Sequence, residues 1–373
     1  MSKAKLTLLL VLVIVSLIGI GFYFNNLAKR STIPSIETDN IQTVAVIDAK
    51  KAPRLSVLAE NLEIPWALVF LPDRSILFTE RAGRVRIIDS ESNLASSPVA
   101  VIEEVLHQGE GGLMGITIHP NFANNHFVYL YYTYGSSGDE TLNRVVRFKF
   151  ENNILSNKTI IVDRIPGASN HNGGRIKFGS DGFLYITTGD SQNPSLAQNI
   201  NSLAGKILRV TDDGTEVFSY GHRNPQGITW DSQGRLWATE HGPSTVDELN
   251  IIEIGKNYGW PTITGDGEQK GLETPILNSG SDTWAPSGAA YLPRRQAGLN
   301  GSIFFAGLRG QALFEYNIES KSLTPHLKGQ LGRIREVVLG PGNLLYITTS
   351  NRDGRGIPKN LDDKIIRINP NKL

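Results

Sequence analysis

The sequence predicts an all-β fold, a six-bladed β-propeller, preceded by an N-terminal transmembrane or signal segment. Three observations predict the propeller: one strand–turn–strand phrase recurs six times, turn residues separate the apolar runs, and the body lacks a useful helical period. In each copy an apolar segment meets Pro, Asp or Gly, and a second apolar strand follows that usually ends in Thr or a similar residue. Short strands separated by turn residues at regular spacing are typical of β-sandwiches and propellers.

The six copies follow one another through the body. They are Trp66–Glu80, Gly115–Thr133, Arg175–Asp190, Gly227–Gly242, Ala289–Gly307 and Glu336–Ser350. Their turns lie roughly 46–61 residues apart, near the ~40–50 residues of a propeller blade. Each copy is usually followed by another strand that begins with a basic residue, such as GRVRIID or DKIIRI. We expect the strand near Arg54–Leu58 to close the ring by pairing with the last blade. Two stacked β-sandwich domains are the alternative, although no linker-like composition divides the body.

The length of the chain agrees with a ring. It has 373 residues, more than the ~250–300 at which a single core stops growing, and a ring avoids this limit because each blade packs against two neighbours. The predicted organisation is a signal-anchor or signal peptide in residues 1–30, a tether in residues 31–52 and the propeller in residues 53–373.

The N-terminal segment contains a nearly unbroken apolar run over residues 6–24, with lysines before it and Lys29 and Arg30 after it. Its nineteen residues are close to the ~20 that span a bilayer and exceed the ~7–15 of a secretory apolar region. We therefore expect an uncleaved membrane anchor, with a cleaved signal peptide as the alternative. Either places the body outside the cytoplasm, in the periplasm or at the cell surface.

Composition excludes several classes of function. The 37 Lys and Arg against 36 Asp and Glu give a net charge of +1, which argues against a nucleic-acid partner. The chain has no cysteine, so disulfides, thiolate zinc sites, iron–sulfur clusters and cysteine nucleophiles are absent.

Unusual polar residues recur in the loops that precede the repeats. Loops at one end of a propeller converge on its central channel, so these residues predict one shared site. Glu110 lies in a glycine-rich loop, and His171 lies between asparagines and glycines just before a strand. An imidazole with a pKa near ~6.5 suits proton abstraction. The next loop contains Arg223, whose planar fork suits a carboxylate or a developing oxyanion, together with Asn224 and Gln226. The alternatives without a function are that His171 is an ordinary surface-loop histidine and that Asn224 only forms an Asn-Pro turn.

Two further groups extend this site. The carbonyls of Gly242 and Pro243, with the carboxylates of Asp247 and Glu248, are hard oxygen ligands that suit Ca²⁺, unless they form a solvated acidic turn. Three arginines lie at the starts of later strands, and with Arg223 they would form an electropositive pocket for a small polyanion. The alternative is that each of them pairs with an acidic residue on the surface. They are Arg309, Arg333 and Arg335.

These motifs carry a family resemblance. The ordered set GEGGLMG, NHNGGR, GHRNPQG, EHGP, DELN, NYGWP, APSG and R-x-R resembles the soluble quinoprotein aldose/glucose dehydrogenases, which are six-bladed propellers that use pyrroloquinoline quinone (PQQ) and bound calcium. The resemblance runs from about Leu55 to Pro370. It implies oxidation of aldose sugars at C1 to lactones, with an electron acceptor that the sequence does not name, by a monomer or homodimer.

The resemblance also implies roles for individual residues. His171 matches the general base that takes the C1 hydroxyl proton as hydride passes to PQQ C5, and Arg223 matches the arginine beside the C5 oxygen. The residues matched to other PQQ contacts are Glu110, Asn224, Gln226, Thr283, Arg309, Arg333 and Arg335. The carbonyls of Gly242 and Pro243 match the calcium ligands, and Glu248 with the carbonyl of Tyr258 resembles a second, structural calcium site.

Three positions depart from the family pattern. Glu110 replaces a glutamine, and its charge would repel a tricarboxylate unless it is protonated or faces an arginine. Asn170 replaces an aspartate, and Arg309 replaces a lysine. Two other functions stay open: a calcium-dependent propeller hydrolase of the lactonase kind, and a non-catalytic binding module at the cell surface.

Overall fold

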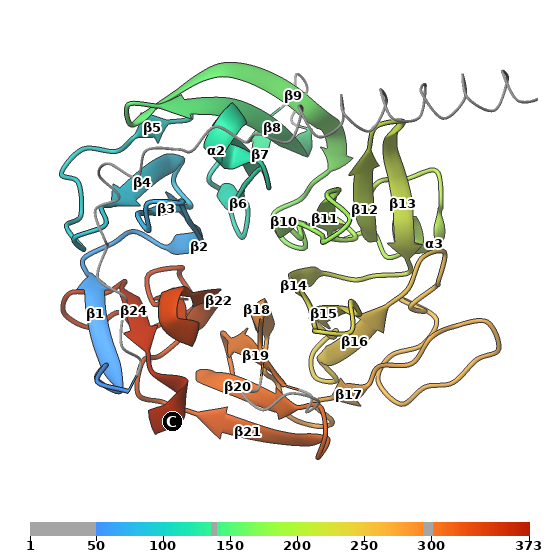
Figure 1. Cartoon of the computed structure of the whole chain (residues 1–373). Helices are drawn as coiled ribbons and strands as arrows, with labels where there is room; N and C mark the ends of the chain where they lie inside the picture. Colours follow the sequence, from blue (N-terminus) through green and yellow to red (C-terminus); the bar gives the residue numbers. More distant parts are fainter. Residues whose placement is uncertain (1–49, 136–139, 294–300) are drawn as a thin grey trace, which may run out of the picture. The chain divides into compact units, whose positions relative to one another are not determined.

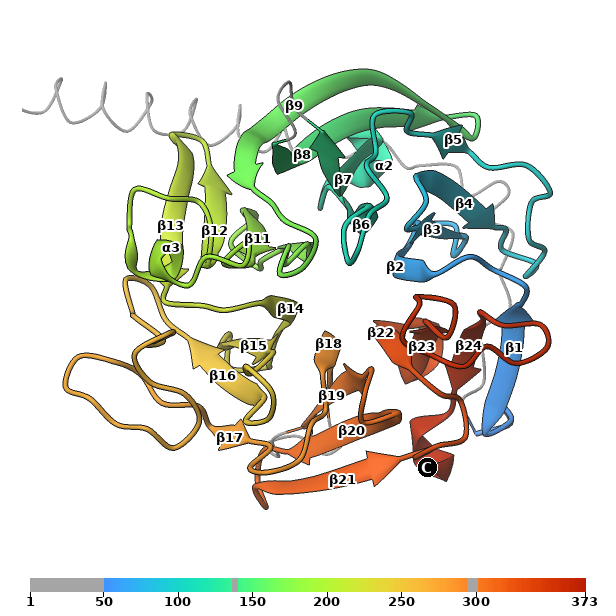
Figure 2. The ribbon, with the colours of Figure 1, turned by 180° about the vertical axis from the view of Figure 1, so that it is seen from behind.

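The computed structural model describes residues 50–135, 140–293 and 301–373. Six four-stranded antiparallel sheets surround a common centre, as Figure 1 shows from one side and Figure 2 from the other. The predicted all-β, six-bladed propeller is therefore confirmed. The apolar run at residues 6–24 lies outside the described residues, and among the described residues no helix is long and apolar enough to cross a membrane.

The blades follow one another along the chain, and the strands of each blade are given below from the innermost to the outermost. Blade 1 comprises β2 (Pro65–Phe70), β3 (Ile76–Glu80), β4 (Arg84–Ile88) and β5 (Ala100–Val101); blade 2 comprises β6 (Leu113–Ile118), β7 (Phe127–Gly135), β8 (Thr141–Glu151) and β9 (Ile154–Pro166); and blade 3 comprises β10 (Ile176–Phe178), β11 (Leu184–Thr188), β12 (Lys206–Thr211) and β13 (Gly214–Tyr220). Blade 4 comprises β14 (Pro225–Trp230), β15 (Leu236–Glu240), β16 (Glu248–Ile252) and β17 (Leu277–Asn278); blade 5 comprises β18 (Pro286–Leu292), β19 (Ser302–Gly307), β20 (Ala312–Asn317) and β21 (Ser322–His326); and blade 6 comprises β22 (Ile334–Gly340), β23 (Leu344–Thr349), β24 (Ile365–Ile368) and β1 (Leu55–Ala59). Short helical turns are α2 (Phe122–Asn125), α3 (Ser195–Gln198), η1 (Pro341–Asn343) and η2 (Pro370–Lys372).

Blade 6 closes the ring. Its outermost strand, β1, comes from the start of the body and pairs antiparallel with β24, with Leu55 opposite Ile368. This confirms the strand expected near Arg54–Leu58. The pairing joins the two ends of the propeller and covers an edge of β24 that would otherwise be exposed.

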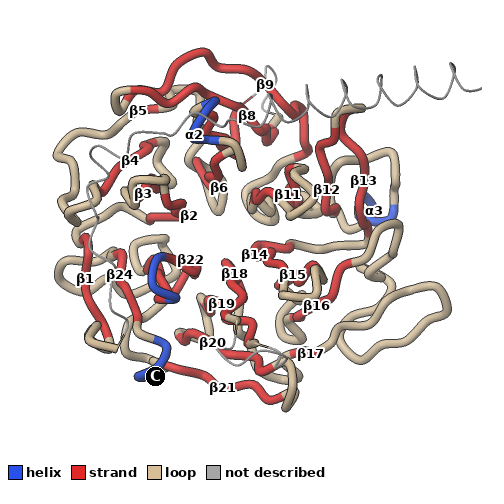
Figure 3. The backbone as a smooth tube through the Cα atoms, in the orientation of Figure 1, coloured by secondary structure: helices blue, strands red, loops and turns tan. Residues whose placement is uncertain are grey.

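The repeated phrase corresponds to the two inner strands of each blade and the turn between them. The second strands, such as β3, β11 and β23, are buried along their whole length because neighbouring blades cover both of their faces. Figure 3 shows the strands grouped in sheets around the centre, with loops connecting them.

The inner strands begin irregularly at one end of the channel. In five of the six inner pairs, all but β10–β11, the register shifts within the first few residues of the inner strand. Bulges of this kind bend a strand and redirect its side chains, and they are frequent beside functional sites. Here they lie at residues such as Gln226 and Arg335.

A buried ion pair connects two of the inner strands. Arg175 of blade 3 pairs with Glu336 of blade 6, and both are almost completely buried. Arg175 also donates to the carbonyl of Gln226 at 2.9 Å and lies 4.3 Å from the ring of Trp66. The pair therefore links opposite sides of the ring, and through the carbonyl of Gln226 it contacts the start of the inner strand β14.

Candidate functional site

A polar cavity of about 390 Å³ lies where the loops and the inner strand starts converge. All of the predicted catalytic and cofactor-binding residues line it, together with Gly242 and Pro243. The lining side chains from the prediction are Glu110, His171, Arg223, Asn224, Gln226, Thr283, Arg309, Arg333 and Arg335. Asn170 and Asp247, which the sequence also singled out, line it too, and the structure adds His241 and Arg355. The ring thus brings together residues that the sequence spreads over more than 240 positions.

His171 forms a pair with a buried aspartate. Its Nδ1 lies 2.7 Å from Oδ1 of Asp190, whose side chain is fully buried. The second oxygen of Asp190 accepts from the indole of Trp260 at 2.8 Å. A carboxylate at Nδ1 keeps the hydrogen on that nitrogen, so Nε2 is the nitrogen that can accept a proton. The sequence reasoning missed Asp190, because an aspartate directly after a strand is an ordinary turn residue.

A glycine makes this pairing possible. Gly189 precedes Asp190, and a Cβ at this position would lie 2.0 Å from the carbonyl oxygen of His171. The backbone of the loop that carries His171 therefore rests directly on the end of β11. His171 itself has a φ of 60°, which is uncommon for a residue other than glycine.

Arg223 lies between β13 and β14, beside this pair. Its Nη1 donates to the carbonyl of His241 at 3.4 Å, and its guanidinium lies 5.4 Å from the ring of Trp260. Burial lowers the pKa of the Arg223 guanidinium, and the carboxylates of Asp190 and Glu240 oppose that effect. Its Nε is buried and has no hydrogen-bond partner within the described part of the chain.

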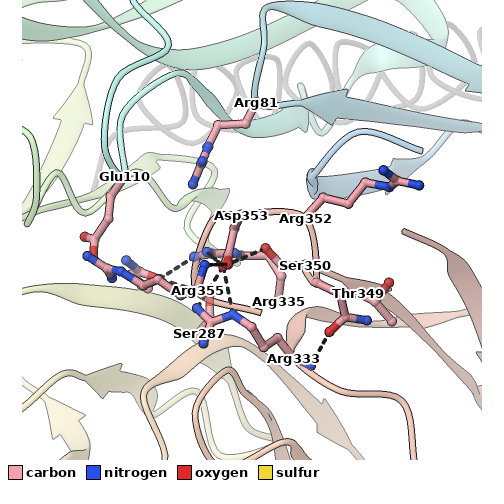
Figure 4. A network of polar contacts seen from close by, with 12 residues as sticks. Arg81, Glu110, Ser287, Arg333, Arg335, Thr349, Ser350, Arg352, Asp353 and Arg355 are labelled. Carbon is pink, nitrogen blue, oxygen red and sulfur yellow. Dashed lines mark hydrogen bonds and ion pairs between the residues drawn. The ribbon is translucent and has the colours of Figure 1, made fainter. Parts of the chain in front are cut away.

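Arg333 and Arg335 lie at the start of β22 and share one acid. Arg333 donates from Nε to Asp353 at 2.9 Å, and Arg335 lies 3.5 Å from the same carboxylate oxygen (Figure 4). Arg335 also donates to the side-chain oxygen of Gln226 at 3.0 Å. Burial raises the pKa of Asp353, but Arg335 and Arg333 outweigh burial and hold that pKa below its usual range.

Glu110 faces an arginine, as its charge requires. One carboxylate oxygen pairs with Arg355 (Figure 4), and the other accepts from the backbone N–H of His171 at 3.2 Å. Arg355 also donates to Oδ1 of Asn170 at 2.9 Å. Burial raises the pKa of Glu110, but the surrounding charges, Arg355 among them, outweigh it and lower the pKa.

Three other residues that were predicted to contact the cofactor support the loops or lie at the edge of the cavity. Asn224 is buried and accepts from the backbone N–H of Gly173 at 3.0 Å, so it also holds the His171 loop. Thr283 donates to the carbonyl of Ser244 at 2.8 Å, and Arg309 is exposed at the rim of the cavity. His241, which the sequence reasoning did not select, also lines the cavity, and burial lowers its pKa to about 4.

The predicted calcium ligands are divided between this cavity and a smaller one beside it. The carboxylate of Asp247 accepts from the backbone N–H groups of Gly242, Trp284 and Ala285 at 2.7–2.9 Å, so it holds two loops in place. Glu248 and Tyr258 do not line the main cavity. They line an adjacent cavity of about 10 Å³, together with Gly242 and Pro243, which is near the ~10–15 Å³ needed for one water. Across the described ranges, no group of three or more His, Asp or Glu residues could hold a metal ion.

Comparison with known proteins identifies the family of this chain. Residues 62–361 match the family model of the glucose/sorbosone dehydrogenases. The chain is 31% identical to the aldose sugar dehydrogenase YliI of Escherichia coli, over 80% of this chain and 91% of that protein. It is 30% identical to quinoprotein glucose dehydrogenase B of Acinetobacter calcoaceticus, over 58% of this chain and 54% of that protein. The structure of a PQQ-bound aldose sugar dehydrogenase from Streptomyces coelicolor superposes with a TM-score of 0.77 at 37% identity, and the match covers 84% of this chain and 98% of that one. The chain therefore belongs to the glucose/sorbosone dehydrogenase family.

Proposed function

We propose that this protein oxidises aldose sugars at C1 to lactones, with PQQ and calcium bound at the central cavity. The observation that carries the proposal is the convergence of the His171–Asp190 pair and the arginines in one cavity. A base held by a carboxylate suits removal of a hydroxyl proton, and a cationic cavity suits a small polyanion.

The residues of the cavity fit a tricarboxylate such as PQQ. Within the described residues, three buried nitrogen atoms of cavity residues have no hydrogen-bond partner: Nε of Arg223, Nε of Arg335 and Nε2 of His241. The two arginine nitrogens are donors, and a buried donor without a partner is costly. A bound ligand with several acceptor oxygens would therefore supply partners that the protein itself does not provide. The volume also lies within the ~300–1,000 Å³ of ordinary cofactor sites.

In this proposal each side chain has a defined task. His171 takes the proton of the C1 hydroxyl at Nε2, and Asp190 stabilises the imidazolium through Nδ1–H. Arg223 stabilises negative charge that develops beside it. Arg333 and Arg335 hold and orient the cofactor carboxylates. PQQ, when bound, supplies the acceptor for the two electrons of the oxidised carbon.

Calcium would rely on backbone oxygens in this loop. Within the described part of the chain, the carbonyls of Gly242 and Pro243 accept no hydrogen bond, whereas the carboxylate of Asp247 already accepts from three amides. Such oxygens suit Ca²⁺, and the cofactor itself would complete the coordination. We propose Glu248 and the carbonyl of Tyr258 as ligands of a second, structural calcium in the adjacent cavity.

The test is reconstitution of the purified full-length protein with PQQ and Ca²⁺, followed by reduction of an artificial electron acceptor with a panel of aldoses. We expect sugar-dependent reduction that needs both PQQ and Ca²⁺, and His171→Ala should remove turnover while leaving PQQ binding largely intact. Failure with every aldose would contradict the proposal, and lactone hydrolysis without quinone would favour the hydrolase instead.

We also propose that residues 6–24 anchor the protein and place the propeller outside the cytoplasm. The length and apolar character of this run support the proposal. Protease treatment of intact cells should digest the propeller only if it is extracytoplasmic, and retention in membranes after alkaline extraction would distinguish an anchor from a cleaved peptide.

A further inference from the structure

The loop that carries His171 is held by an ion pair between residues of two other loops. Arg355 lies on the loop between β23 and β24 of blade 6, and Glu110 lies on the loop between β5 and β6. Both residues line the cavity, and Figure 4 shows the side chains of their ion pair close together. The side chain of Arg355 is 55% exposed. The second donor group of Arg355 reaches Asn170, the residue before His171.

Glu110 uses its two carboxylate oxygens for different partners. One takes the guanidinium of Arg355, and the other accepts the backbone N–H of His171. The backbone N–H of Glu110 also donates to the carbonyl of Ser169 at 2.7 Å. The carboxylate therefore contacts the main chain of the proposed base and not its imidazole.

The backbone of His171 needs such support. Its φ of 60° lies in the left-handed region, where a residue with a Cβ persists only if its surroundings hold it. Asp190 fixes the imidazole, and Asn224 holds Gly173, two residues farther on. Among the described residues, the hydrogen bond that fixes the amide of His171 itself is the one to Glu110.

We propose that Glu110 and Arg355 are positioning residues that hold the main chain of His171 so that Nε2 points into the cavity. The proposal rests on the proposed role of His171 as the base. It also explains why a carboxylate can lie beside a site for a polyanion: Arg355 neutralises Glu110, and the ion pair acts on the protein backbone.

The first experiment measures hydrogen exchange at the His171 amide, resolved to that residue, in the full-length protein without added cofactor. We expect Glu110→Ala to speed exchange at least tenfold and Arg355→Ala at least threefold. Arg355→Lys should stay within threefold of the wild type because a lysine can still pair with Glu110. None of these changes alters the sequence neighbours of His171, so its intrinsic exchange rate is unchanged. The control Glu216→Ala removes an ion pair with Arg209 on blade 3 and should leave this amide unaffected.

The second experiment compares kcat and KM in PQQ-loaded enzyme. We expect Glu110→Ala and Arg355→Ala to lower kcat at least tenfold, with the KM for sugar changed less than threefold. Unchanged exchange at His171 in Glu110→Ala would overturn the proposal, and so would a raised KM with an unchanged kcat, which would place the pair in direct contact with sugar. The exchange result does not depend on turnover, so failure of the proposed function and failure of this inference are separate outcomes.

Discussion

Substitution of Gly189 by alanine tests the geometry of the proposed base most directly. A Cβ on Gly189 would lie 2.0 Å from the carbonyl oxygen of His171, and contacts shorter than 3.0 Å are essentially never found. The two segments must therefore separate by about 1 Å, the difference between these distances. Because Asp190 directly follows Gly189, its 2.7 Å contact with Nδ1 of His171 would stretch beyond hydrogen-bond length. Misplacement of a reacting group by ~1 Å costs about 100-fold in rate.

The assay is kcat of the PQQ-loaded enzyme at saturating sugar. We expect a decrease of about 100-fold for Gly189→Ala, and no change for Gly135→Ala, where a Cβ would meet nothing within 4 Å. Thermal unfolding of both variants shows whether the propeller remains folded. A kcat for Gly189→Ala within threefold of the control, in a folded protein, would refute the reasoning that the His171–Asp190 distance governs turnover.

Three other changes test the site. Asp190→Asn should lower kcat by about 10²–10⁴-fold, the usual contribution of a positioned base, while an absorbance titration shows PQQ binding largely retained; equal loss of binding would indicate a structural role. Arg335→Ala should weaken PQQ binding about 10-fold or more, the scale of one charged hydrogen bond, whereas Arg209→Ala on the outside of blade 3 should not. Asp353 has a pKa held below its usual range, so its stabilising effect is present above the unfolded value of ~3.9 and is lost as the pH falls below it. Asp353→Asn should therefore destabilise the protein to chemical denaturation at pH 7 and much less at pH 3, and a constant difference would contradict the assignment.

The fold could be predicted because its signals are local. Apolar segments and the turn residues between them lie within each repeat, and the structure places every repeat on the two inner strands of one blade. The pairing of β1 with the last blade could also be predicted, because without it the outer strand of that blade would have an exposed edge. The early register shifts of the inner strands could not be predicted, because they depend on how neighbouring blades crowd the channel.

The site was predicted in part, for a physical reason. Loops with unusual groups of polar residues were recognised, but Asp190, Asp353 and Arg355 each follow a strand, where polar residues are the ordinary choice for a turn. Their roles come from partners fixed by the ring. Asp190 meets a residue 19 positions away, Asp353 one 20 positions away, and Arg355 one 245 positions away. The most distant of these contacts, between Arg355 and Glu110, neutralises the charge that was expected to repel a tricarboxylate.

Ring closure and the site are connected through one loop. The segment between β23 and β24 carries both Asp353 and Arg355, and its C-terminal end is fixed by the chain that follows β1: Leu62 exchanges two backbone hydrogen bonds of 3.0 Å with Asp363, and Asn61 donates to Leu361 at 2.9 Å. The connection that closes the propeller therefore also anchors the loop that neutralises Glu110 and aligns Arg333 and Arg335. In a ring of this kind, the strand that joins the two ends supports the site as well as the fold, because the last blade supplies the acid and the arginine on which the other loops depend.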